Sequence, residues 1–206
     1  RVAHDKPLLT TYPPRYYRVG GADVLDTSAG VQRLTLVRLK GDLTTRQKTE
    51  PVPSTLGPGK SRFIAAGFIF TLGRFCREVE YDPSLYFAGE EIALAARAFT
   101  QGYRFYYPNE NVIWHYYDHG APLHWSDHSR RQTQLHAHAI LRLRKLLTGK
   151  HEDLGRYGLG LVRTLRDYER YAEIDFRGAL GNNHRKRPIR FVRRISLETR
   201  DIETRD

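Results

Sequence analysis

The segment that decides the fold runs Tyr86-Phe-Ala-Gly-Glu-Glu-Ile-Ala-Leu-Ala-Ala-Arg97. Three apolar residues of this segment and one that follows it recur with the spacing of one helix face: Ile92, Ala95, Ala96 and Phe99. Glu90 and Glu91 fall in the first turn, where the helix dipole favours negative charge, and Gly102 suits the position after the last turn. The segment therefore predicts an amphipathic helix that begins near Glu90.

Strands are predicted on both sides of this helix. Upstream, Phe63–Thr71 is a continuous apolar run, which predicts a central strand buried on both faces. Gly67 in its middle would weaken a strand unless something approaches the backbone closely there. The pattern also predicts strands over residues 8–12, 34–39, 103–107 and 111–117. The prolines and glycines of residues 41–60 predict a loop without regular structure.

Two more helices are predicted toward the C-terminus. One covers residues 127–147 and is closed by Gly149, and the other covers residues 165–172. Thr164 and Asp167 are typical of a capping box at the start of the second one. Strands mixed with helices in this way indicate an α/β protein.

Composition excludes several classes of protein. With 40% hydrophobic and 28% charged residues, the chain is neither disordered nor collagen-like. Its longest apolar run is too short to span a bilayer and no signal peptide opens it, so we expect no membrane partner. Cys76 is the single cysteine, which excludes a disulfide scaffold and suits a reducing compartment. We therefore expect a cytoplasmic location.

The net charge of +11 is concentrated in the C-terminal third of the chain. Residues 1–128 carry a net charge of +2, whereas residues 129–206 carry +9. This concentration fits a face that binds an anion, and it fits equally well solvated helix faces and a charged tail. Few aromatic residues alternate with these arginines and no nucleic-acid motif is present, so a nucleic-acid partner is not expected.

Histidines and carboxylates are the candidate functional groups. Six histidines fall within 24 residues: His115, His119, His124, His128, His136 and His138. Gly120 and Pro122 interrupt any helix between the first of them, which disfavours a shared zinc site. For His115, a structural role and a ligand role both stay open. Glu90 and Glu91 either serve the helix dipole or hold sugar hydroxyls and a reacting proton beside Gly89, whose missing side chain lets a ligand approach the backbone.

Several short motifs follow one another in a specific order: Lys6-Pro-Leu-Leu-Thr-Thr-Tyr-Pro13, Phe63-Ile-Ala-Ala-Gly-Phe-Ile-Phe70, Tyr81-Asp-Pro83, Tyr86–Arg97, Thr100-Gln-Gly-Tyr103, Pro108, Trp114-His-Tyr-Tyr117 and Tyr157–Glu169. In this order they resemble the GlcNAc-transferase family, whose known eukaryotic member modifies a hydroxyproline of a cytoplasmic ubiquitin-ligase subunit. The resemblance spans residues 6–176. More distantly, Phe87-Ala-Gly-Glu-Glu91 is similar to the Trp-Gly-Gly-Glu-Asn segment of the polypeptide GalNAc-transferases.

The resemblance implies a fold and an activity. Both families have the GT-A fold, a nucleotide-sugar-binding α/β sandwich, and both are retaining transferases that depend on a divalent cation, Mn²⁺ or Mg²⁺. The implied reaction moves GlcNAc from UDP-GlcNAc to a hydroxyl of a protein or peptide. The family's Asp-x-Asp or Asp-x-His metal motif lies upstream of the Lys6 segment and does not occur in residues 1–206. We therefore expect residues 1–176 to be the C-terminal half of a GT-A-like domain, incomplete at the N-terminus, followed by a basic extension over residues 177–206.

The resemblance also implies roles for matched positions. His115 matches the metal ligand beside the donor diphosphate, and Glu90 matches the carboxylate that contacts donor-sugar hydroxyls. Glu91 is a second catalytic candidate, and Gly89 would give the sugar room. The remaining predicted substrate-binding residues are Ala66 and Gly67, beneath donor and acceptor, and Tyr116 and Trp125, which line a peptide groove or pack beneath a loop. Two alternatives to an enzyme stay open: a transferase-fold scaffold without activity, and a basic module that binds nucleic acid or another anion.

Overall fold

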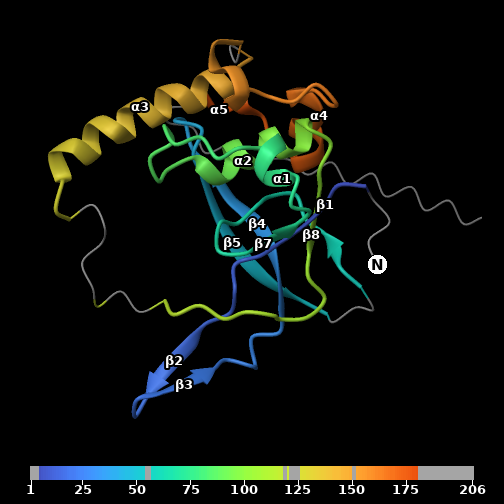
Figure 1. Cartoon of the computed structure of the whole chain (residues 1–206), viewed down its shortest axis with the longest axis vertical. Coiled ribbons are helices and arrows are strands. Elements are labelled where there is room, and N and C mark those ends of the chain that lie inside the picture. The colour runs from blue at the N-terminus through green and yellow to red at the C-terminus, as the bar shows by residue number, and fades with distance from the viewer. Residues whose placement is uncertain (1–4, 54–56, 118–119, 121–125, 150–151, 181–206) are drawn as a thin grey trace, which may run out of the picture.

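A mixed β-sheet lies at the centre of the molecule (Figure 1). The structure is a computed structural model that describes residues 5–53, 57–117, 120, 126–149 and 152–180. The sheet order is β6 (Gly59–Lys60), β8 (Arg104–Tyr107), β1 (Pro7–Thr10) and β7 (Ile69–Thr71). Strands β1 and β8 run parallel, and the other two pairs are antiparallel. The predicted mixed α/β class is confirmed, and β1 and β8 lie where strands are predicted.

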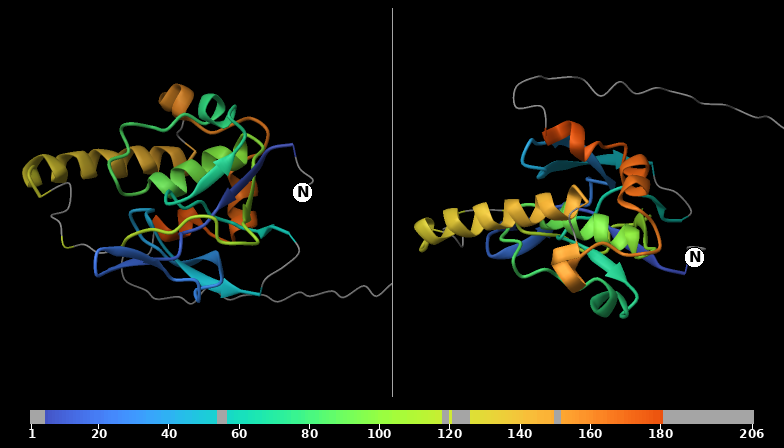
Figure 2. Two further views of the ribbon diagram at one scale, coloured as in Figure 1. Left: turned by 60° about the horizontal axis from the view of Figure 1, so that its bottom comes forward. Right: turned by 90° about the horizontal axis from the view of Figure 1, so that it is seen from above.

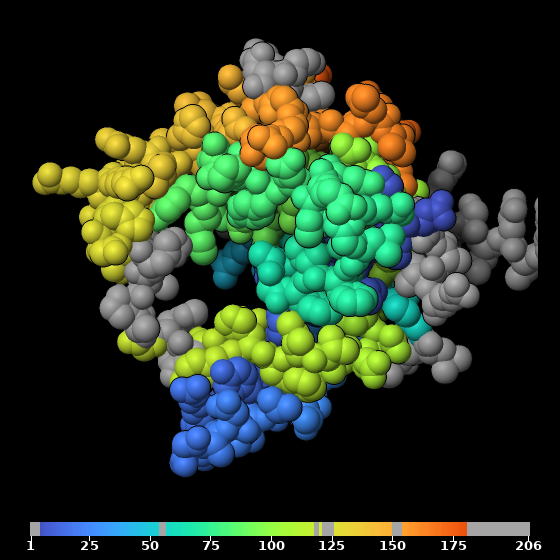
Figure 3. Space-filling view, in the orientation of Figure 1, coloured from blue at the N-terminus to red at the C-terminus, as the bar shows by residue number. Residues whose placement is uncertain are grey.

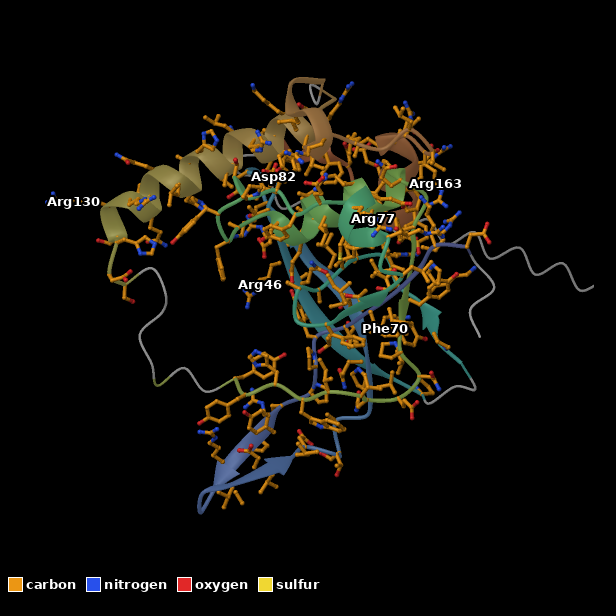
Figure 4. All side chains as sticks on the ribbon, viewed as in Figure 1. Arg46, Phe70, Arg77, Asp82, Arg130 and Arg163 are labelled. Atoms are coloured by element: carbon orange, nitrogen blue, oxygen red, sulfur yellow. The ribbon has the colours of Figure 1, made fainter. Side chains whose placement is uncertain are left out.

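The predicted helix at the deciding segment is confirmed as α2, Glu90–Thr100. All of its residues from Ile92 onward are buried, and Gly102 takes the left-handed conformation after its end, with φ +99°. Its Phe99 ring packs on Tyr171 of α4, with ring centroids 4.9 Å apart. The Arg163 guanidinium lies 4.6 Å from the same ring and is marked in Figure 4. Helix α2 is therefore the centre of the core, which fixes the position of its first turn.

Both C-terminal helices are confirmed as well. Helix α3 covers Ser129–Leu147, and its N-terminal half projects from the body as a straight rod in Figures 1 and 2. Helix α4 covers Leu165–Ala172, and Thr164 and Asp167 form the predicted capping box. Short helices α1 (Phe75–Glu78) and α5 (Phe176–Leu180) and a 3₁₀ helix (Glu152–Tyr157) are not predicted by the sequence. No helix in the described ranges is both long and apolar enough to cross a bilayer.

The prediction of a central strand over Phe63–Thr71 is wrong. Only Ile69–Thr71 forms a strand, β7, and it lies at an edge of the sheet with Phe70 66% exposed (Figure 4). Phe63–Ala65 is buried without strand pairing, because the Thr10 hydroxyl takes the place of a strand partner. It accepts a hydrogen bond from Ala65 N–H (2.9 Å) and donates one to Ala65 C=O (3.3 Å). A continuous apolar run predicts burial, but it does not distinguish a strand from an irregular segment whose backbone is satisfied by side chains.

The predicted loop over residues 41–60 is also wrong, because it contains strand β5, Thr45–Val52. Among the described strands it pairs only with β4 (Val31–Leu39), and β4 confirms and lengthens the strand predicted at 34–39. Pro51 lies opposite Gln32 in this two-stranded ladder. Since β5 has no second strand partner among the described residues, the N–H that proline lacks is not needed there.

Residues 111–117 do not form the predicted strand. Within this segment, only His115 forms a β-bridge, a parallel one to Arg15. The sequence analysis also missed a hairpin of β2 (Tyr16–Val19) and β3 (Ala22–Leu25), which projects at the bottom of Figure 1. Gly20 and Gly21 both have positive φ at its two-residue turn, and two adjacent glycines are a recognised signal for such a turn.

Candidate functional site

Glu91, in the first turn of α2, joins three segments of the chain. Its Oε2 accepts hydrogen bonds from the Tyr12 hydroxyl (2.6 Å) and from Gln47 Nε2 (3.1 Å). Its Oε1 accepts one from the Ala66 N–H (2.9 Å). Tyr12 lies just after β1, Gln47 lies on β5, and Ala66 directly follows the buried Phe63–Ala65 segment. The structure thus brings the predicted residues Ala66 and Glu91 together, and Glu91 fastens the start of α2 to the sheet.

Glu90 is the half-buried neighbour of this anchored carboxylate. Burial raises the pKa of Glu90 to about 7, and the charge of Glu91 adds to the effect. Burial, together with the charges of Glu90 and Glu91, raises the pKa of the nearby Tyr81 phenol to about 12. A carboxyl group with a pKa near 7 is present in both protonation states at neutral pH, so it can hold or release a proton there. Perturbed carboxyls of this kind cluster at functional sites.

The raised pKa of Glu90 predicts how stability changes with pH. Its folded-state pKa of about 7 exceeds the ordinary value of 4.5. The contribution of Glu90 to the free energy of unfolding is therefore fully present below pH 4.5 and is lost as the pH rises through 7. The loss at pH 8 amounts to on the order of 3 kcal/mol. In urea unfolding between pH 4.5 and 8, Glu90→Gln should flatten this decline, whereas Glu110→Gln, at an exposed position, should leave it unchanged. A Glu90→Gln curve parallel to that of the wild type would contradict the assignment.

Gly67 lies against the chain that leaves β1. A Cβ atom there would lie 3.0 Å from Pro13 Cδ and 3.7 Å from Tyr12 Cδ1. The close approach that the sequence predicts at this glycine is therefore made by the protein's own side chains, those of Pro13 and Tyr12. Gly67 is exposed at this position, and its place beneath donor and acceptor stays a prediction.

Gly89 has a structural explanation. It caps α2 in the left-handed conformation, with φ +88°, and a Cβ atom there would lie 2.5 Å from Leu143 Cδ2 of α3. Both the backbone conformation and the helix contact thus require glycine. That the missing side chain also leaves space for the donor sugar stays a prediction.

Gly89→Ala should destabilise the fold. The positive φ and the contact with the fully buried Leu143 together should lower the free energy of unfolding by about 2 kcal/mol or more. Gly73→Ala is the matched control, because Gly73 has no positive φ and a Cβ atom added there would meet nothing within 4 Å. Urea unfolding of both variants measures the difference, and equal stabilities would show that the α2–α3 contact adapts freely.

The backbone of His115 is hydrogen-bonded to the segment that follows Tyr12 and Pro13. Its N–H donates to Pro14 C=O (2.8 Å), and its C=O accepts from Tyr16 N–H (3.1 Å). Its exposed ring lies 4.4 Å from that of Tyr117, whose hydroxyl donates to Pro13 C=O (2.9 Å). His115 is thereby held next to the segment that continues from Tyr12, the residue bound to Glu91.

A metal centre is not complete in the described part of the chain. No three His, Cys, Asp or Glu side chains come together among these residues. Among the described residues, His115 would therefore be a single metal ligand. His119, His124 and Trp125 lie outside the described residues, whereas His136 and His138 are exposed on α3.

The face of the molecule that is drawn in Figure 3 is hollowed. Figure 3 shows the hollow between the N-terminal half of α3, the segment before α2 and the 108–117 segment. Two contacts hold the segment before α2 against α3: Tyr86 Oη lies 2.7 Å from His128 Nε2, and Arg142 Nε donates to Asp82 Oδ2 (2.5 Å). Figure 4 marks Asp82 under α3 and Arg46 on the side of β5 that faces the opening.

Sequence reasoning missed Tyr12 and Gln47, the two side chains that hold Glu91. Tyr12 carries a usable signal, because it is the last residue of a predicted strand and precedes two prolines. Burial and the charge of Glu91 raise its pKa, so its phenol stays a hydrogen-bond donor. Gln47 carries no such signal, since it lies in the segment that the prolines and glycines predict to be a loop.

A family model described as Glycosyltransferase (GlcNAc) matches residues 1–178. The match covers most of the chain, so this chain belongs to that glycosyltransferase family. The family transfers sugars from a donor to an acceptor, which is consistent with the mixed α/β architecture. No curated protein matches the chain.

Proposed function

We propose that the protein moves GlcNAc from UDP-GlcNAc to a hydroxyl of a protein or peptide, with retention of configuration. The proposal includes a GT-A-type fold and dependence on Mn²⁺ or Mg²⁺, both implied by the resemblance of the sequence motifs. The observation that carries it is Glu90, a half-buried carboxyl with a pKa of about 7 beside an anchored second carboxylate. Family membership supports sugar transfer as the reaction class.

Glu90 and Glu91 have different proposed roles. Glu90 accepts hydrogen bonds from donor-sugar hydroxyls, and its carboxyl oxygens can hold a proton when the sugar is bound. Glu91 is a positioning residue, because its oxygens are used by Tyr12, Gln47 and the Ala66 N–H. Holding these groups in one geometry before the donor arrives lowers the entropic part of the barrier to transfer. For Glu91, which the sequence analysis gives as a second catalytic candidate, the proposed role is to hold the site in its geometry.

UDP release tests the proposal directly. The full-length gene product, incubated with UDP-GlcNAc and Mn²⁺, should release UDP faster than with UDP-GalNAc or UDP-glucose, and EDTA should stop the release. An NMR spectrum of the product should show the anomeric configuration of the donor. If no UDP-sugar is turned over, the proposal is wrong. If another UDP-sugar is preferred, only the choice of GlcNAc as the donor sugar is wrong.

His115→Ala should nearly abolish metal-dependent turnover while leaving the fold intact. Its ring is exposed and only its backbone bridges Arg15, so the midpoint of thermal unfolding should change little. Turnover with Mn²⁺ should fall by about 100-fold, the scale for loss of one group that stabilises a leaving-group charge. His138→Ala, at an exposed position of α3, is the control. Unfolding of His115→Ala, or unchanged turnover, would make His115 structural.

A further inference from the structure

A second depression lies beside His115, outside the Glu90–Glu91 cluster. It has a volume of about 310 Å³ and an open mouth. Two short segments line it, one at the start of the β2–β3 hairpin and one after His115: Arg15, Tyr16, Tyr17, Arg18, Tyr116 and Tyr117. The Tyr117 hydroxyl donates to the Pro13 carbonyl, and Pro13 follows Tyr12, which binds Glu91, so this Arg–Tyr pocket is connected to the candidate site through one short segment.

The two arginines of the Arg–Tyr pocket differ in their partners. Arg18 donates to Asp23 Oδ1 across the hairpin (3.2 Å). Arg15 forms no ion pair with any residue in the described ranges. Its guanidinium carbon lies 5.7 Å from the Tyr17 ring centroid and 5.9 Å from that of Tyr117. These rings orient the guanidinium without neutralising it, which prepares it for a bidentate carboxylate.

The surfaces around Arg15 are aromatic and apolar. Tyr16 and Tyr116 pack with ring centroids 5.3 Å apart and form one wall. Tyr17 shares one face of the hairpin with three further exposed apolar residues: Val19, Ala22 and Val24. Tyrosine-rich surfaces of this kind contact peptide side chains and backbone with little loss of side-chain entropy.

We propose that the Arg–Tyr pocket binds the acceptor polypeptide, with Arg15 pairing with an Asp or Glu near the modified hydroxyl. This inference rests on the proposed function and adds the class of acceptor, a segment with an acidic residue beside the site of transfer. Tyr117 lines the pocket and binds Pro13, and the neighbouring Tyr12 binds Glu91, so one short segment connects the pocket to the carboxylates. Specificity for a carboxylate follows because an uncharged isostere would leave Arg15 unpaired.

The charges of the pocket favour a peptide over a polyanion. A nucleic acid would present several phosphates, but the described part of the pocket offers one cation without an ion pair, and the Asp23 carboxylate is bound to the other. A peptide with one carboxylate and apolar neighbouring residues would pair with the Arg15 guanidinium and cover the tyrosine rings. Among the described residues, Arg15 is thus suited to a single negative charge.

Peptide binding tests this inference without requiring turnover. The probes are fluorescein-labelled peptides of Ala and Gly with a central Ser, in which one Glu is moved stepwise along the sequence, and a matched set with Gln. Fluorescence anisotropy with the full-length gene product should show about tenfold tighter binding for Glu than for Gln at one or two positions, weakening with salt. Arg15→Gln should remove this preference. Arg130→Gln, on the projecting end of α3 in Figure 4, should keep it.

The outcomes separate this inference from the proposed function. No preference for Glu, or a preference that survives Arg15→Gln in a variant with unchanged thermal unfolding, overturns the peptide assignment. Arg15-dependent binding of an oligothymidine in place of the Glu peptides overturns it as well. UDP release without an acceptor reports donor turnover separately, so a protein that binds Glu peptides but releases no UDP refutes the proposed function alone. In an active enzyme, Arg15→Gln should raise the acceptor KM about tenfold.

Discussion

Glu90→Gln should lower the rate of sugar transfer by at least about 100-fold while the protein stays folded. The amide keeps the shape of the side chain, but it cannot hold or release a proton and is a weaker acceptor for sugar hydroxyls. Stability should not fall at pH 8, because the substitution removes a buried group that is largely ionised there. Initial rates of UDP release, together with urea unfolding at the same pH, measure both effects.

The comparison with Glu90→Asp sharpens this test. Aspartate keeps the ionisable group but withdraws it by one methylene, so activity should fall less than in Glu90→Gln. Equal, complete losses in both variants together with a lower unfolding midpoint would show that Glu90 supports the fold. Unchanged turnover in Glu90→Gln would remove it from the reaction.

Glu91→Ala should have the largest effect on stability. The substitution leaves three donors without their acceptor: the Tyr12 hydroxyl, the Gln47 amide and the Ala66 N–H. Loss of a half-buried charged acceptor with several partners costs about 3 kcal/mol. For a chain of this size, that loss lowers the midpoint of thermal unfolding by about 10 °C. Calorimetry of Glu91→Ala beside Glu90→Ala should show the larger drop for Glu91.

Tyr12→Phe tests one of the three hydrogen bonds to Glu91 by itself. It removes a single donor to Glu91 and should lower the free energy of unfolding by about 1 kcal/mol. A double variant of Tyr12 and Glu91 should lose less than the sum of the two single changes, because the Tyr12 bond can be lost only once. Additive losses would mean that the two side chains do not act on each other.

Helices were predictable from the sequence because their signals are local. The start of α2 depends on Glu90 and Glu91 in the first turn, and the start of α4 on the reciprocal bonds of Thr164 and Asp167. Each signal lies within four residues of the feature that it determines. The same holds for the glycine at position 102, whose φ is positive.

Strands and contacts were less predictable, because they depend on residues far apart in the chain. The Phe63–Ala65 segment avoids the strand that its composition favours because Thr10, 55 positions from Ala65, satisfies its backbone. The role of Glu91 likewise depends on Tyr12 and Gln47, 79 and 44 positions away. The resemblance points to Glu90, with Glu91 as a second candidate, and only their contacts show that Glu91 is the anchored carboxylate.

The central claim is that Glu90 serves a sugar-transfer site, and one measurement tests it most directly. The full-length gene product and its Glu90→Gln variant are incubated with UDP-GlcNAc, Mn²⁺ and an acidic acceptor peptide, and UDP and the peptide mass are followed. The wild type should release UDP and add the mass of one N-acetylhexosamine to the peptide, and the variant should do so at about one hundredth of the rate or less. Addition of the sugar at equal rates by both proteins would contradict the account.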